Sequence, residues 1–468
     1  MKLKYNIITL LLLSAGVQSC DLMGSIDKIQ PEYVLEDGSG TVIIDEATAN
    51  MALNGLYDCM RNSDVANMRR ALGGLSGVIG GVQQVSNSNE FVSGNITEKN
   101  LTVEKAYRGY YRVVNEANSF LNNLELSGVT EKELPVETKE GMIAEVRCLR
   151  GLFNFHLLRL FGQYQDMDSK YGIVLNDKPI TSNEPKARTT VQKTYDSIIE
   201  DLDYAIEHGS HGEEHWRASA LFAKAIKSRV LLTVGKYAES AQVAGEVIVE
   251  AEADGYALEN DYMGVFTNQF NSSEVLFAPY VDANTTPQQL FASCAVDYFQ
   301  PGNILTSISL GMPGKKDLRY AAEYERVNGH GNNKYLYSGY PDVNTYYFMR
   351  LAEVYYIKAE AEARLQDYDA AGSALAEVIA RAGYDEGYVN GIPDARMLEI
   401  ILKHKMLDLN AENGEEWFDM VRYHRNGDFA SWSEEEQGYL PTFHFCIFPI
   451  PRTVRAGNAL LEQTPEFN

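Results

Sequence analysis

The chain has 468 residues, 45% of them hydrophobic and 23% charged, which is enough apolar sequence for a large core and excludes wholesale disorder. Lys and Arg together number 41 against 65 for Asp and Glu, and the resulting net charge of -24 repels a phosphate backbone. The balance therefore argues against general nucleic-acid binding, but it does not identify a ligand.

The first twenty residues are typical of an export signal. Lys2 and Lys4 form a basic start, and residues 7–17 are mostly apolar but too few to span a bilayer. Cys20 follows a small residue at the end of this run, as in the cleavage site of bacterial lipoproteins, where the new N-terminal Cys is diacylated. An ordinary secretory signal with a coincidental Cys is the alternative.

These features predict the domain organisation. We expect a signal peptide over 1–19 and a lipidated, flexible tether over 20–40, because that stretch contains Gly, Ser and acidic residues without periodicity. A single helical domain is predicted over 41–468. More than one acyl chain on Cys20 would hold the protein stably at a membrane, whereas a single chain would not.

Four further cysteines, Cys59, Cys148, Cys294 and Cys446, are too few in a chain of this length to form a disulfide framework. We expect isolated thiols that are mostly buried, which is the usual position of a free Cys.

Apolar residues at helical spacing dominate the rest of the chain. Met142, Val146, Leu149 and Phe153 follow one another at intervals of three and four, beside a second apolar face, and predict a central helix over 142–161. Similar patterns predict helices over about 45–62, 104–126, 190–207, 217–234, 237–252, 346–365, 368–382, 394–411 and 415–425. Strand-like alternation is limited to short stretches such as 275–281 and 443–450, so the predicted fold class is all-α with little β structure.

Two pairs of these helices are alike. In each pair a helix is followed by a tight turn, an aromatic residue (Tyr237 or Tyr368) and then a small residue (Ala241 or Ala371) that lets the second helix approach. This pattern resembles the tetratricopeptide helix-turn-helix unit. The copies start about 130 residues apart rather than about 34, so insertions must interrupt the repeat scaffold.

The largest insertion, 253–345, is rich in Gly, Asn, Pro and aromatic residues. A second irregular segment, 73–100, is polar. Long irregular segments on a rigid scaffold commonly carry binding residues, so both are candidate ligand-binding regions.

Six blocks follow one another along the chain: 107–118 (YRGYYRVVNEAN), 144–153 running into 160–162, 195–202 (YDSIIEDL), 349–361 (MRLAEVYYIKAEA), 417–422 (WFDMVR), and 448–451 (FPIP) with Asn458 and Gln463. Together with Cys20, these blocks resemble the SusD/RagB surface lipoproteins of Bacteroidetes. The chain departs from the family pattern at His404–Lys405, where a Glu-Arg pair is usual, and at Glu416, where an Arg is usual. These departures put one structural ion pair in doubt.

The resemblance implies an all-α scaffold of tetratricopeptide-like units with a loop-rich ligand-binding face. Family members lie on the cell surface over a SusC-like TonB-dependent outer-membrane transporter, capture glycans or in some cases peptides, and have no catalytic role. The resemblance also implies helix-packing ion pairs or caps at three pairs of matching positions: Arg350 with Glu353, Arg147 with Glu145, and Asp419 with Arg422.

Capture of a neutral sugar needs flat apolar faces for the C–H surfaces of the ring, and amide or carboxylate groups for its hydroxyls. In starch-binding relatives, loops from about these two irregular segments form the site. The predicted ligand-binding residues are therefore Asn87, Asn89, Phe91, Tyr298, Phe299 and Tyr320. Packing in a core beneath the loops is the alternative for each aromatic residue, and the lack of Trp in both segments weakens the case for a large sugar platform.

The predicted function is non-catalytic binding of an oligosaccharide at the cell surface and its delivery to the transporter. Peptide capture by the same face and a purely structural scaffold remain alternatives. No cofactor is predicted. His211, Glu214 and His215 have the H-x-x-E-H spacing of some zinc peptidases, but that motif requires a helix. Gly209 and Gly212 interrupt the segment, which favours a solvated connector without metal.

Overall fold

The structure, a computed structural model, describes residues 43–61, 96–182, 184–212, 214–281, 316–324, 345–410, 412–428 and 446–467, with isolated positions at 65, 72, 83–84, 300–301 and 334. Within these residues the chain is mostly helical, which confirms the predicted all-α class. The predicted signal peptide and tether lie outside the described residues and stay predictions. No helix in the described part of the chain combines the length and the apolar character needed to cross a bilayer.

The long helices lie where the apolar periodicity predicts them: α2 (Glu46–Met60), α5 (Leu101–Leu126), α6 (Val136–Phe161), α7 (Val191–His208), α8 (Ala220–Thr233), α9 (Tyr237–Ala253), α14 (Leu351–Arg364), α15 (Tyr368–Ile379), α17 (Met397–Leu409) and α18 (Glu415–Asn426). Shorter helices are α10 (Gly264–Asn268), α13 (Leu318–Tyr324), α16 (Glu386–Asn390) and α20 (Arg452–Gly457).

The helix predicted over 346–365 begins later than expected. Met349–Arg350 forms a short strand, β4, that pairs antiparallel with β2 (Val275–Phe277), and α14 starts only at Leu351. Helical periodicity cannot reveal this pairing, because the partner strand lies more than seventy residues earlier in the chain.

Polar residues before the helices explain where several of them begin. The Asp45 carboxylate accepts a hydrogen bond from the Thr48 amide at 2.9 Å, and the Thr48 hydroxyl accepts from the Asp45 amide at 3.0 Å, which forms a capping box for α2. The side-chain oxygens of Asn100, Thr190 and Ser219 each accept one hydrogen bond from an amide in the first turn of α5, α7 and α8. These caps satisfy amide groups that the first turn of a helix leaves without an intrahelical partner.

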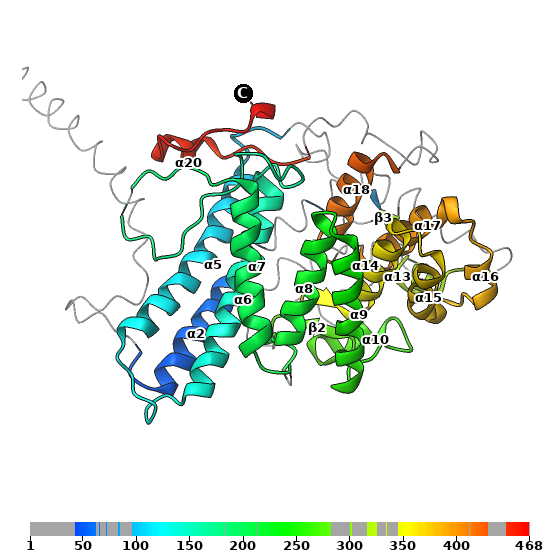
Figure 1. Ribbon diagram of the computed structural model, residues 1–468, viewed down its shortest axis with the longest axis horizontal. Helices are drawn as coiled ribbons and strands as arrows, with labels where there is room; N and C mark the ends of the chain where they lie inside the picture. The colour runs from blue at the N-terminus through cyan, green and yellow to red at the C-terminus, as the bar shows by residue number, and fades with distance from the viewer. Residues whose placement is uncertain are drawn as a thin grey trace, which may run out of the picture.

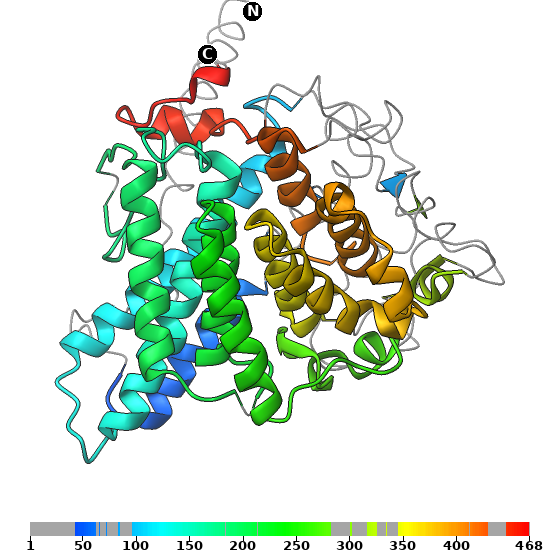
Figure 2. The same ribbon diagram turned by 45° about the vertical axis from the view of Figure 1, so that its right-hand side comes forward.

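The helices pack side by side in nearly the order in which the chain makes them (Figure 1). Contacts run from α2 through α5, α6, α7, α8 and α9 to α14, and from there to α15 and α17, while α20 lies across one end of α5–α7 (Figures 1 and 2). Almost every residue of α6 from Leu149 to Phe161 is buried, as expected of a helix that is apolar all round. The prediction of a central helix here is confirmed.

The two predicted repeat units are neighbours in space. The α8–α9 and α14–α15 pairs each form a helical hairpin, and α9 packs against α14. Both hairpins turn through a residue with positive φ, Gly235 at 78° and Gln366 at 66°. The two hairpins therefore pack directly against each other, although a long insertion separates α9 from α14 in the sequence.

Charged residues form a connected cluster inside the second half of the scaffold. Arg350 donates to Glu412 and Asp408 at 2.8 and 2.9 Å and also pairs with Glu274. The members of this buried ion cluster, whose side chains are at most 5% exposed, are Arg319, Lys334, Arg350, Arg381, Glu274, Asp317, Glu323, Asp408 and Glu412.

The implied ion pairs are partly wrong in their partners. Glu353 pairs with Arg229 at 2.7 Å rather than with Arg350. Arg147 pairs with Asp201 at 2.8 Å rather than with Glu145. These exchanges arise because the facing charge comes from another helix, α8 for Glu353 and α7 for Arg147.

The implied pair of Asp419 with Arg422 is confirmed at 2.8 Å. Lys405, at one of the positions that depart from the family pattern, also pairs with Asp419 at 2.8 Å, so an ion pair persists there.

Candidate functional site

Two irregular segments, predicted from sequence to share one face, meet in the structure. Strand β1 (Gln83–Gln84) pairs antiparallel with β3 (Gln300–Pro301), which joins the polar segment before α5 to the large insertion. Five of the six predicted ligand residues lie outside the described residues and stay predictions: Asn87, Asn89, Phe91, Tyr298 and Phe299.

The sixth predicted residue, Tyr320, lies on α13. Its side chain is half-buried against the core, and the centre of its ring is 5.3 Å from that of Tyr324. Its role in ligand binding also stays a prediction.

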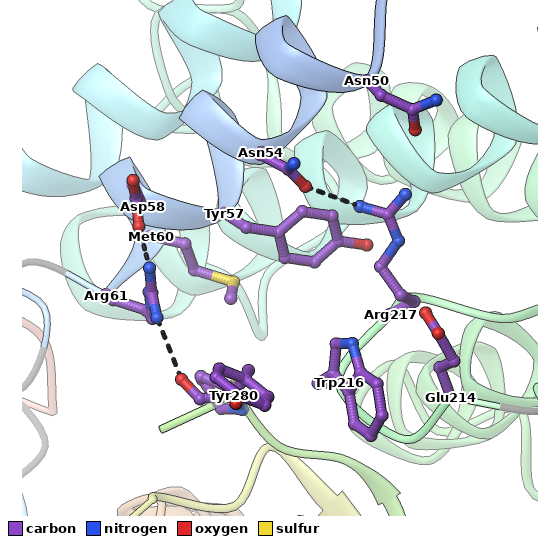
Figure 3. Close-up of a pocket in the computed structure, with 11 residues that line it drawn as sticks. Asn50, Asn54, Tyr57, Asp58, Met60, Arg61, Glu214, Trp216, Arg217 and Tyr280 are labelled. Atoms are coloured by element: carbon purple, nitrogen blue, oxygen red, sulfur yellow. Dashed lines mark hydrogen bonds and ion pairs between the residues drawn. The ribbon is translucent and has the colours of Figure 1, made fainter. Parts of the chain in front are cut away.

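A groove of about 570 Å³ lies between the C-terminal half of α2, the connector before α8 and the residues after β2 (Figure 3). Its lining combines aromatic rings, amides and charged groups: Asn50, Asn54, Tyr57, Asp58, Met60, Arg61, Glu214, Trp216, Arg217, Pro279 and Tyr280. The volume is within the range of small-ligand sites.

Aromatic rings form one side of the groove. Tyr280 is 42% exposed, and its ring centre lies 5.7 Å from that of Trp216, with the two planes inclined at 68°. Phe270 lies behind both, 5.4 Å from Trp216 and 5.2 Å from Tyr280. The buried Phe270 thus holds two partly exposed rings nearly at right angles to each other.

Amide groups from α2 lie opposite these rings, with Tyr57 and Arg217 between them (Figure 3). Asn50 and Asn54 lie one turn apart and therefore on the same face of the helix. Asn54 accepts a hydrogen bond from Arg217 Nη1 at 3.2 Å, and Asn50 donates to the Glu46 carbonyl at 3.1 Å. The site thus combines ring faces and amide groups across one open groove.

A carboxylate that is only 13% exposed, that of Glu145, supports this wall. Glu145 of α6 accepts a hydrogen bond from the Tyr57 hydroxyl at 2.6 Å and pairs with Arg217 Nε at 3.2 Å. Burial raises the pKa of Glu145, and the positive charge of Arg217 partly opposes this increase. Burial also raises the pKa of Tyr57 well above its ordinary value. The Ala218 amide donates to the same Tyr57 oxygen at 2.8 Å, so the connector before α8 is fastened to α2.

The groove also lies where both irregular segments leave the described body. Arg61 is at the C-terminal end of α2, and it donates to the Tyr280 carbonyl at 3.0 Å while pairing with Asp58. The segment that carries Asn87 follows Arg61 in the chain, and the segment that carries Tyr298 follows Tyr280. The predicted loop residues and the groove are therefore adjacent along the chain at both of these points.

Sequence reasoning missed Trp216 and Tyr280 as candidate ligand residues. Trp216 directly follows the Gly-interrupted segment that the sequence predicts to be a solvated connector, and Tyr280 lies within 275–281, a stretch whose alternation predicts a strand. The sequence does contain a signal for Trp216, which stands directly beside an Arg in a non-helical connector. Because the connector has no helical periodicity, nothing predicts that this ring packs in the core, and an exposed ring is a candidate for ligand binding.

His215 lies outside any helix, as the connector interpretation predicts, but its side chain is packed rather than solvated. Its ring stacks on Tyr256 with centres 4.7 Å apart, and Nδ1 lies 3.0 Å from the Ser272 carbonyl oxygen, outside any helix. Burial lowers the pKa of His215. Among the described residues, no three His, Cys, Asp or Glu side chains come together as a metal site.

Comparison with known families decides the identity of this helical stack. A family profile described as "SusD family" matches residues 313–466, and a second, described as "Starch-binding associating with outer membrane", matches residues 36–232. The two matches do not overlap and together cover most of the chain. The chain belongs to the SusD/RagB family.

Solved structures share the fold of this SusD/RagB protein. A SusD superfamily protein from Bacteroides thetaiotaomicron superposes with a TM-score of 0.75 at 21% identity, over 90% of this chain and 99% of that one. A SusD superfamily protein from Bacteroides vulgatus gives a TM-score of 0.76 at 23% identity, over 92% of this chain and 99% of that one.

Curated relatives match over shorter stretches. A SusD-like protein of Bacteroides ovatus is 27% identical over 146 residues, which is 31% of this chain and 25% of the relative. The SusD-like protein P25 of Formosa agariphila is 22% identical over 191 residues, which is 39% of this chain and 33% of the relative. The chain thus matches between a quarter and a third of the length of these relatives.

Proposed function

We propose that this protein binds an oligosaccharide at the outer membrane without cleaving it and passes it to a partner TonB-dependent transporter of the SusC type. The observation that carries the proposal is the groove that the Trp216 and Tyr280 rings line together with amides of α2. Support also comes from the family, whose members are binding proteins, and from the description of the profile that matches residues 36–232 as starch-binding and outer-membrane associated.

The chemistry of the groove suits a sugar. A pyranose ring presents C–H groups on its faces and hydroxyls around its edge, so one aromatic ring can cover a face while amides bond to the edge. The rings of Trp216 and Tyr280 stand nearly perpendicular, so both can contact one bent oligosaccharide. A few such contacts give a dissociation constant on the order of μM to mM, which suits a protein that must release its ligand to a transporter.

The site we propose continues from the groove onto the two irregular segments. The residues proposed there are Asn87, Asn89, Phe91, Tyr298, Phe299 and Tyr320. The β1–β3 pairing supports this extension, because it holds the two segments together.

The test is a glycan array followed by calorimetric titration, using soluble protein that begins after Cys20. We expect Trp216→Ala and Tyr280→Ala each to weaken binding of the best neutral glycan about tenfold, through loss of a stacked ring. Tyr204→Ala is the matched control, since its half-buried ring lies on α7 against Arg147 and outside the groove lining. Unchanged affinity in both groove variants would contradict this site. If a peptide binds and no glycan does, the ligand class is peptide rather than oligosaccharide.

The lipid anchor and the partner need tests of their own. We propose diacylation at Cys20, so Cys20→Ala protein should lose membrane association in the native host, and retention would contradict it. Co-purification of a barrel with the anchored protein would support delivery, whereas co-purification with no glycan binding would favour the structural scaffold.

A further inference from the structure

The two asparagines in the groove differ in which atom they can offer a ligand. Arg217 Nη1 faces the Asn54 side chain at 3.2 Å, and a guanidinium has only donors. The Asn54 atom that faces Arg217 must therefore be the amide oxygen, which leaves the NH₂ group for a ligand. Asn54 is exposed on the side of α2 that lines the groove.

The side-chain amide of Asn50 has the opposite orientation to that of Asn54. Its side chain lies 3.1 Å from the Glu46 carbonyl oxygen, and a carbonyl can only accept. The NH₂ group of Asn50 must therefore face the helix backbone, which leaves its amide oxygen for a ligand. Positions i and i+4 of a helix are neighbours, so α2 presents an acceptor and a donor one turn apart.

Arg217 can impose this polarity because it is itself fixed. Its Nε pairs with Glu145 at 3.2 Å, and its guanidinium carbon lies 5.1 Å from the centre of the Tyr57 ring. Glu145 in turn is held by the Tyr57 hydroxyl at 2.6 Å. Removing the Glu145 charge would free Arg217 to turn away, and Asn54 could then present either of its amide atoms.

We propose that Asn50 and Asn54 recognise a pair of sugar hydroxyls with fixed polarity, Asn50 accepting and Asn54 donating, and that Glu145 acts through Arg217 as the positioning residue. This inference rests on the proposed function and adds its ligand class, a neutral glycan with free hydroxyls. A hydroxyl can both donate and accept, so two hydroxyls satisfy the pair. A carboxylate cannot donate to Asn50, so a uronate placed there leaves the amide oxygen without a partner.

The charges around the groove also favour a neutral glycan over an anionic one. Arg61 and Arg217 are paired with Asp58 and Glu145, and Glu214 adds a further exposed carboxylate to the lining. The groove lining holds two arginines and two carboxylates, and Glu145 behind it pairs with Arg217, so the groove has no excess positive charge to attract an anionic glycan.

The test compares two substitutions that change the charge equally. Asn54→Asp removes the donor, so affinity for maltoheptaose, cellohexaose or mannohexaose, whichever binds, should fall about tenfold. Asn50→Asp keeps an acceptor for the ligand but loses the hydrogen bond to the Glu46 carbonyl, so affinity should fall by about threefold, clearly less than in Asn54→Asp. Hexagalacturonic acid should bind the unaltered protein more weakly than the neutral oligosaccharides. Equal losses in the two variants, or a larger loss in Asn50→Asp, would overturn the assignment.

Glu145→Gln tests the positioning role. It should weaken binding about threefold to tenfold in the unaltered protein, but cause little further loss when Asn54→Asp is already present. A merely structural role for Glu145 would give the same loss in both backgrounds and would overturn the positioning role.

Trp216→Ala in the same titrations separates the two proposals. If it abolishes binding while the two Asp variants behave alike, the polarity is wrong and the groove remains the site. If Trp216→Ala has no effect, or if none of these oligosaccharides binds, the proposed site fails and the polarity fails with it.

Discussion

Removing one cation from the buried ion cluster should destabilise the scaffold severely. Arg350 contacts three carboxylates, those of Glu274, Asp408 and Glu412, and all four side chains are almost inaccessible to solvent. The cluster holds four cations and five carboxylates, so it already carries one excess negative charge. Arg350→Met would leave two excess negative charges in a medium where water cannot screen them.

The expected loss is about 3–5 kcal/mol of unfolding free energy, the usual result when one partner of a buried pair is removed. A folded domain has only about 5–15 kcal/mol in total, so a large part of the stability would go. The control is Arg108→Met, which breaks a 3.2 Å pair with Glu104 on the surface of α5, where Arg108 is 48% exposed. That change should cost at most about 1 kcal/mol.

Urea unfolding followed by far-UV circular dichroism would measure both variants at 25 °C, with reversibility checked by dilution. Glycan affinity of Arg350→Met protein, measured below its unfolding transition, should be unchanged, because Arg350 does not line the groove. The reasoning is refuted if Arg350→Met lowers the unfolding free energy no more than Arg108→Met does. Such a result would mean that water or rearrangement compensates the carboxylates.

Two further predictions follow from the pKa shifts of buried groups. Burial, aided by Arg319, lowers the pKa of His404 to about 3, below its ordinary value, so the unfolded chain binds the proton first as pH falls. The contribution of His404 to the unfolding free energy should therefore be complete above about pH 6.5 and about 2 kcal/mol smaller at pH 5. Urea unfolding of His404→Phe protein at several pH values should lack this pH dependence of the unfolding free energy. Burial raises the pKa of Cys59 to about 12 and of Cys446 to about 11, so iodoacetamide at pH 7.5 should label both slowly in folded protein and quickly in denaturant. Peptide mass spectrometry would report each site, and equal labelling in both states would contradict burial of the thiols.

The helices could be predicted because their causes are local. Periodicity marks the buried face of α6, and caps such as Asp45 and Ser219 mark where helices begin, all within a few residues of sequence. Tertiary pairing is not local. The β2–β4 ladder that delays α14 and the exchange of Glu353 onto Arg229 both depend on residues brought together from distant positions.

The groove could not be predicted for the same reason. Asn54, Trp216 and Tyr280 lie on three separate stretches of the chain, and none belongs to a motif that names the others. The family resemblance indicates the two irregular segments as ligand-binding regions. It did not indicate that the connector before α8 contributes a Trp to the same region, although Trp216 is visible in the sequence.

Hydrogen bonds between these stretches make the groove rigid before any ligand arrives. The Ala218 amide donates to the Tyr57 hydroxyl, and the Tyr346 hydroxyl donates to the Met60 carbonyl at 3.1 Å. The Thr345 hydroxyl donates to the Pro279 carbonyl at 2.5 Å. Each bond joins two walls of the groove, or a wall to the scaffold, so binding does not have to order these walls. Because ordering is a main cost of association, modest stacking and a fixed donor–acceptor pair can be enough to hold a sugar here.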